Sequence, residues 1–125
     1  MPTESSSPIG WLDAPQEHNY PAAESYLSLI HDPKESAKIA GALRAQPLSK
    51  FKAKDIFRAS QLSILGVSNL HVEKDRKKIA EGQALSPLLL VRDQDKGRVV
   101  IADGYHRLCA VYGVDEDAWI PCKIV

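Results

Sequence analysis

The sequence predicts a single domain of mixed α/β (α+β) class, with helices first and a small mixed sheet after them. At 125 residues the chain has the length of one ordinary domain. Its first part spaces apolar residues as amphipathic helices do, whereas the part after residue 86 carries the short, continuous apolar runs of buried strands. We expect residues 1–20 to form a flexible arm and 21–125 one domain, with a helical extension over 21–65 and the core over 66–125.

Composition and charge favour a cytoplasmic protein that binds neither membranes nor nucleic acid. The formal net charge is zero, with 16 basic and 16 acidic side chains, so no excess positive charge attracts a phosphate backbone. The longest apolar run, residues 87–91, is too short to cross a bilayer, and residues 1–7 lack a signal-peptide pattern. In that compartment Cys109 and Cys122 are expected to be reduced. No metal site is predicted, because paired ligand motifs are missing.

Four helices are predicted before the sheet, over residues 21–30, 33–45, 54–60 and 71–81. The second has the clearest beginning, since Asp32 suits an N-cap and Pro33 suits the first helical position. Gly82 suits the residue that follows the end of the fourth helix.

The second part of the chain predicts a strand–strand–helix–strand unit. Strands over 87–91 and 98–102 flank a turn and form a hairpin. A helix is expected over 105–112, ended by Gly113, before a last strand over 119–125. Pro121 predicts that this last strand lies at an edge or contains a bulge, because proline has no N–H to donate.

The corner between the second strand and this helix has the composition of an anion site. The first amides of a helix are unpaired, and a preceding glycine lets a ligand approach the backbone closely. Gly104 stands there, followed by His106, which can exchange a proton near neutral pH, and Arg107, whose donors suit phosphate oxygens. A structural alternative remains open, in which Asp103 is only an N-cap and the basic residues form a solvated first turn.

A second basic feature lies on the preceding helix. His71, Lys74 and Lys78 have the spacing i, i+3, i+7, which places them on one helical face. A charged stripe is usually a solvated face. It becomes part of an anion site if it faces Arg107.

The segments "PLLLV", "RVVIADGYHRLCAVYG" and "AWIPCKIV" together resemble the ParB/sulfiredoxin superfamily, over about residues 70–125. This resemblance implies a small mixed sheet with helices, and a Gly-x-x-Arg box that grips the phosphates of ATP, ADP or CTP, with Mg²⁺ as an accompanying ion. The box corresponds here to Gly104, Tyr105, His106 and Arg107. Aligning the helices places His71, Lys74 and Lys78 on the nucleotide-facing side.

The chain departs from both named relatives. Tyr105 occupies the position of the sulfiredoxin catalytic cysteine, and a phenol with a pKa near ~10 cannot replace a thiolate at neutral pH. Sulfiredoxin activity is therefore not expected. The helix-turn-helix that follows the ParB clamp has no counterpart in the sequence, so chromosome partitioning is not expected either.

Three functional hypotheses follow from the sequence. The first is a nucleotide-binding protein acting as an NTP hydrolase or small-molecule phosphotransferase, which needs a base. The candidates for that base are Asp103, Glu73, Asp75 and His106. The second is a non-catalytic module whose N-terminal helices bind a protein partner or a second copy in a homodimer. The third, a metal-dependent nuclease, would need Asp93, Asp95 and Asp103 to gather around a metal.

Overall fold

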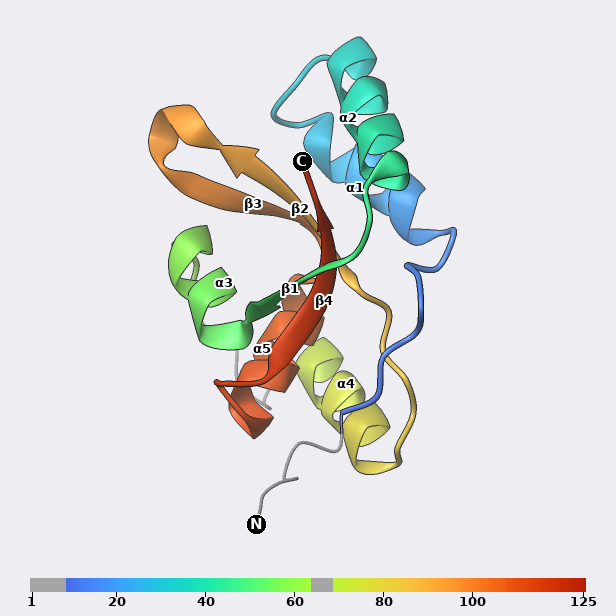
Figure 1. The fold of residues 1–125 in the computed structure, drawn as a ribbon, viewed down its shortest axis with the longest axis vertical. Helices are drawn as coiled ribbons and strands as arrows, with labels where there is room; N and C mark the ends of the chain where they lie inside the picture. Colours follow the sequence, from blue (N-terminus) through green and yellow to red (C-terminus); the bar gives the residue numbers. More distant parts are fainter. Residues whose placement is uncertain (1–8, 64–68) are drawn as a thin grey trace.

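The computed structural model describes residues 9–63 and 69–125, and these form helices on both sides of a small sheet (Figure 1). The helices are α1 (Asn19–Leu27), α2 (Pro33–Ala45), α3 (Ala53–Ser60), α4 (Leu70–Ala80) and α5 (Tyr105–Val114). The strands are β1 (Ser49–Lys52), β2 (Leu88–Asp93), β3 (Arg98–Asp103) and β4 (Trp119–Ile124), with a 3-10 turn at Gln94–Lys96. The predicted mixed α/β class is confirmed. No described helix is both long enough and apolar enough to span a bilayer.

The strand order in the sheet is β1-β4-β2-β3. The predicted hairpin is confirmed as the antiparallel β2–β3 pair, while β4 runs parallel to β2 and antiparallel to β1. The prediction for Pro121 is wrong, because β4 lies inside the sheet and its register with β1 is continuous. A proline has no N–H to donate to a neighbouring strand. Pro121 is accommodated because the pairing of β4 with β2 begins only at the next residue, Cys122.

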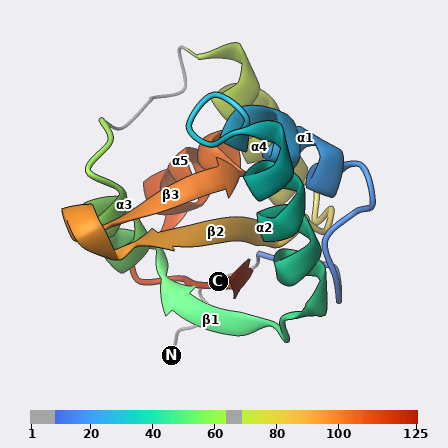
Figure 2. The same ribbon diagram turned by 90° about the horizontal axis from the view of Figure 1, so that it is seen from above.

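Helices cover both faces of the sheet, which explains the continuous apolar run in β2. Leu88 and Leu90 pack into a core with residues of α3, α4 and α5, whereas Leu89 and Val91 pack on the opposite face with residues of α1 and α2. Figure 2 shows β2 and β3 running between these two groups of helices. A strand buried on both faces needs apolar side chains at successive positions.

The helix ends largely follow the local sequence. The Asp32 carboxylate accepts a hydrogen bond from the Glu35 N–H at 2.8 Å, and Asn69 caps α4 in the same way. Gly82, with φ +76°, follows the end of α4 as predicted. The predicted end of α5 at Gly113 is wrong, since the helix continues to Val114. A glycine inside a helix costs only about 1 kcal/mol, which burial of the rest of α5 outweighs.

The segment before α1 contacts the body of the protein. Trp11 forms a parallel bridge with Leu85, and the Leu85 N–H donates to the Gly10 carbonyl at 2.9 Å. Of the predicted arm over 1–20, residues 9–20 therefore pack on the domain, and residues 1–8 lie outside the described residues. The predicted extension over 21–65 supplies β1, so it shares one sheet with the core.

The two-sided burial of β2 gives a first prediction. Leu89→Ala removes a fully buried side chain from the face covered by α1 and α2, and should lower the free energy of unfolding by about 2–5 kcal/mol. Leu29→Ala is the matched control, because Leu29 is 83% exposed and its loss should change stability by less than about 0.5 kcal/mol. Denaturant unfolding measures both. Equal losses for the two variants would contradict the layer arrangement.

Candidate phosphate site

A polar pocket of about 230 Å³ lies where α4 meets the start of α5. It is lined by His71, Lys74, Asp75, Lys78, Asp103, Gly104, Tyr105, His106 and Arg107. Every residue that the sequence places in phosphate binding is in this set. Three of the four candidate bases, Asp75, Asp103 and His106, also line the pocket. Glu73 lies on the same helix as Asp75 but does not line the pocket.

Packing between α4 and α5 brings the two basic features together. Val72 and Ile79 of α4 are buried in the same core cluster as Leu108 and Val111 of α5. With these apolar faces in contact, the His71, Lys74 and Lys78 stripe borders the start of α5. The rings of His71 and His106 lie 4.8 Å apart between centroids. The stripe therefore borders the Arg107 corner, while His71 and Lys74 remain exposed to solvent.

Gly104 makes the turn from β3 into α5, and only glycine fits there. Its φ is +109°, a conformation that side chains rarely adopt. A Cβ at this position would lie 2.8 Å from both the Leu88 Cγ and the Arg107 Nη2. The turn leaves the first amides of α5 at the pocket, where unpaired N–H groups attract anions.

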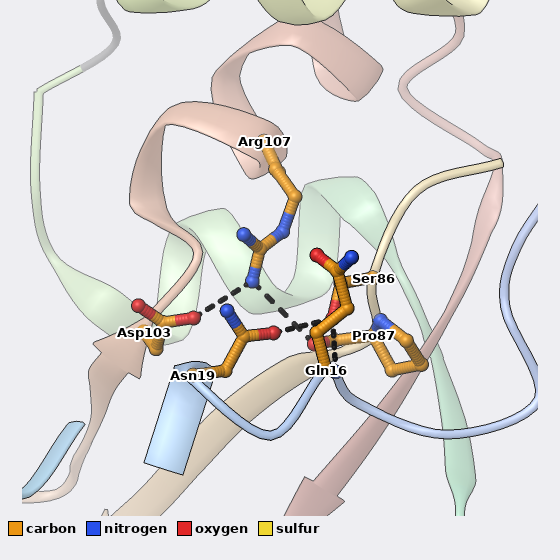
Figure 3. A network of polar contacts seen from close by, with 6 residues as sticks. All are labelled: Gln16, Asn19, Ser86, Pro87, Asp103 and Arg107. Atoms are coloured by element: carbon orange, nitrogen blue, oxygen red, sulfur yellow. Dashed lines mark hydrogen bonds and ion pairs between the residues drawn. The ribbon is translucent and has the colours of Figure 1, made fainter. Parts of the chain in front are cut away.

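Arg107 folds back over this turn onto the strands rather than extending into solvent (Figure 3). Its Nη2 donates to the Asp103 carboxylate at 3.0 Å and more weakly to the Pro87 carbonyl at 3.5 Å. Asp103 thus pairs with Arg107 and does not serve as the N-cap, a position held by Gly104. The Nε is buried and has no hydrogen-bond partner among the described residues.

The charges around the pocket nearly balance. Lys74, Lys78 and Arg107 supply three positive charges against two negative charges from Asp75 and Asp103, a net of +1 with neutral histidines. Burial lowers the pKa of His106, and the neighbouring His71 and, to a smaller extent, Arg107 lower it further, against an opposing effect of Asp75. A neutral His106 can accept a proton from a ligand hydroxyl or water.

The pocket contains no thiolate nucleophile. The Tyr105 hydroxyl donates to the Ser63 carbonyl, and burial together with the neighbouring Cys109 raises the pKa of this phenol. Cys109 is buried in the core, and burial raises the pKa of Cys122 to about 12.

The carboxylates needed for a nuclease do not gather. Asp93 pairs with Arg98 at the turn end of the β2–β3 hairpin, and Asp95 lies in that turn. Asp103 is at the opposite end, paired in register with Leu89. Within residues 9–63 and 69–125, no three His, Cys, Asp or Glu side chains are close enough to share a metal ion.

Sequence reasoning missed the contacts behind Arg107. Asp103 and Arg107 are four residues apart, the spacing at which oppositely charged side chains of a helix form ion pairs. This spacing alone could have indicated their contact. The Pro87 carbonyl could not be anticipated, because it belongs to the residue just before β2, 20 residues away in the sequence. Ser86 beside it accepts a hydrogen bond from the Gln16 N–H and donates to Asn19, tying the segment before α1 to the site (Figure 3).

A larger, mainly apolar groove of about 400 Å³ was also not predicted. It lies between α3 and the β2–β3 hairpin, where Phe51, Ile56, Leu90, Val99 and Ile124 line it together with charged residues of the rim. It is separate from the polar pocket, since the two share no lining residue.

In comparisons with protein-family models, with curated proteins and with solved structures, the chain has no match. The geometry of the pocket and the residues Gly104 to Arg107 are therefore the features of the chain that bear on its function.

The turn at Gly104 gives a second prediction. Gly104→Ala should destabilise the protein by about 1–2 kcal/mol for the backbone conformation and by about 1–3 kcal/mol more for the contacts with Leu88 and Arg107. Gly97→Ala is the matched control, because Gly97 also has a positive φ, +62°, but open space around it. Thermal and denaturant unfolding compare the two. A loss for Gly104→Ala no larger than that for Gly97→Ala would show that the crowding is absent.

A third prediction concerns pH. The pKa of His106 is lowered in the folded protein from its usual value of 6.5, so the unfolded chain binds more protons as the pH falls. The contribution of neutral His106 to stability should be present above about pH 6.5 and be lost as the pH falls toward the folded-state pKa. His106→Gln should reduce this part of the pH dependence of unfolding. An NMR titration placing the pKa of His106 above 6.5 would contradict the assignment.

Proposed function

We propose that this chain is a nucleotide-phosphate-binding protein with a ParB/sulfiredoxin-like fold. The observation that supports the proposal best is the common pocket of His71, Lys74 and Lys78 from α4 and of His106 and Arg107 from α5. These residues were selected from two separate sequence features, and their contact depends on the tertiary packing of the two helices.

Phosphate is the ligand chemistry that suits this pocket. The start of α5 presents backbone N–H groups, and the glycine turn lets an oxygen approach them closely. Lys74 and Lys78 add positive charge from the facing helix. Sites for whole drug-sized ligands span ~300–1,000 Å³, so a pocket of about 230 Å³ suits the phosphates of a nucleotide, with the base outside it.

The pocket also offers groups for chemistry on a bound phosphate. Neutral His106 could take a proton from a water or an acceptor hydroxyl, in NTP hydrolysis or in phosphoryl transfer to a small molecule. Asp75 lines the pocket and forms no ion pair with a described residue, which fits a carboxylate ligand for Mg²⁺. The ion would neutralise phosphate charge, and Lys74 and Lys78 would orient the phosphates.

A non-catalytic interaction module is the second candidate. Its support is the apolar surface formed by the end of α1 and the loop after it. Tyr26 is 45%, Leu29 83% and Ile30 47% exposed there. Neighbouring exposed apolar side chains are typical of contact surfaces. This surface lies in the N-terminal part, where the sequence predicts binding of a protein partner or a second copy.

Titration calorimetry with ATP, ADP and CTP, each with and without Mg²⁺, tests the proposed function. We expect dissociation constants below 1 mM, the value that corresponds to ~4 kcal/mol of binding energy. Arg107→Ala removes charge-assisted hydrogen bonds worth ~1.5–3 kcal/mol each and should weaken binding roughly 10- to 100-fold. Lys78→Ala should weaken it about fivefold to tenfold, as the loss of one nearby charge.

Lys77→Ala is the matched control, because Lys77 is on the same helix but does not line the pocket. It should leave the affinity unchanged within about twofold. Absence of binding below millimolar, with no effect of Arg107→Ala, would refute the proposal. A stable oligomer by light scattering, combined with no phosphate release, would instead favour the interaction module.

A further inference from the structure

Asp103 neutralises the residue that the phosphate site depends on most. Its carboxylate accepts from the Arg107 Nη2 at 3.0 Å, and the side chains of the pair are only 19% and 17% exposed, respectively. Both residues line the pocket. A mostly buried guanidinium without a countercharge is costly, so the carboxylate keeps Arg107 stable in the folded protein. The same carboxylate adds a negative charge beside any bound phosphate.

The remainder of the Arg107 environment does not depend on that negative charge. The Nη2 also contacts the Pro87 carbonyl, and it lies against the Gly104 turn. Pro87 follows Ser86, whose hydroxyl is fixed between the Gln16 N–H and Asn19 (Figure 3). The guanidinium is therefore held from the strand side as well. A neutral acceptor at residue 103 would keep its position.

Arg107 still has donors for a ligand while Asp103 is in place. A guanidinium has five N–H donors, and the contacts with Asp103 and Pro87 both involve Nη2 alone, so they do not engage the other nitrogens. Asp103 is thus not required to leave before a phosphate binds.

We infer that Asp103 is a countercharge that limits the affinity of the pocket for phosphates and sets how strongly it discriminates between ligands of different charge. The inference rests on the proposed function and assigns Asp103 a role other than that of a base. With Asp103 ionised, the lining carries a net charge of +1. Without it the net charge is +2, and the gain in attraction grows with each negative charge of the ligand.

The test compares AMP, ADP and ATP without Mg²⁺, by calorimetry on the wild type and on Asp103→Asn. The asparagine side chain keeps a carbonyl oxygen for the Arg107 Nη2 and removes the charge. We expect tighter binding of all three nucleotides to D103N, by roughly threefold for AMP and roughly tenfold or more for ATP. The gain should shrink as salt is raised, because added ions screen the charge difference.

Asp93→Asn is the matched control. Asp93 also pairs with an arginine at 3.0 Å, and it lies at the other end of the hairpin, away from the pocket. D93N should bind the nucleotides as the wild type does. Asp103→Ser is a second variant that also lacks the charge and keeps an acceptor, and thermal unfolding verifies that each variant is folded.

Unchanged or weaker binding to folded D103N and D103S would overturn the inference, even with nucleotide binding to the wild type intact. A loss of phosphate release at unchanged affinity would also overturn it, because that result identifies a base. Failure of the wild type and D103N alike to bind any nucleotide refutes the proposed function itself. A gain that is equal for AMP and ATP would exclude the charge mechanism.

Discussion

The site depends on one close approach, in which the Gly104 main chain lies against the Leu88 side chain and the Arg107 guanidinium. A single additional carbon at Gly104 would come within 2.8 Å of both. This contact sets where β3 ends and where α5 begins, so the first turn of α5 lies directly beside the start of β2. Arg107 contacts the same strand region through the Pro87 carbonyl. The turn therefore positions the helix and the arginine together.

The pocket forms because α5 is buried on more than one side. Leu108, Cys109, Ala110 and Val111 are all buried, between the sheet and the neighbouring helices. Contact with α4 orients that helix so that its apolar residues face α5 and its His-Lys-Lys stripe borders the opening. The gathering of basic side chains at this pocket is thus a consequence of helix packing against one face of the sheet. The residues themselves come from two helices and one turn.

Local features of the sequence predicted the fold best. The Asp32 cap, the β2–β3 hairpin and the glycine after α4 are determined by interactions between residues close in sequence. β1 was missed because four residues, SKFK, carry too little pattern to identify a strand. The interior place of β4 was missed because pairing partners distant in sequence determine it, while Pro121 alone favours an edge.

The same distinction applies to the site. Gly104, His106 and Arg107 could be selected from sequence because they follow one another at a strand–helix corner. Helical spacing could place His71, Lys74 and Lys78 on one face, but only tertiary packing brings that face to the corner. The position of Glu73 outside the pocket and the pairing of Asp103 with Arg107 also depend on side-chain directions that sequence does not specify.

The most direct test of a phosphate site at the α4–α5 junction is an amide NMR titration of the isotope-labelled chain with ADP. The largest chemical-shift changes should occur at the first amides of α5, from Tyr105 to Arg107, and along the pocket-facing positions of α4. The groove between α3 and the hairpin should change little. Shifts concentrated at Phe51 and Ile56 in that groove, or no shifts at the start of α5, would contradict the assignment.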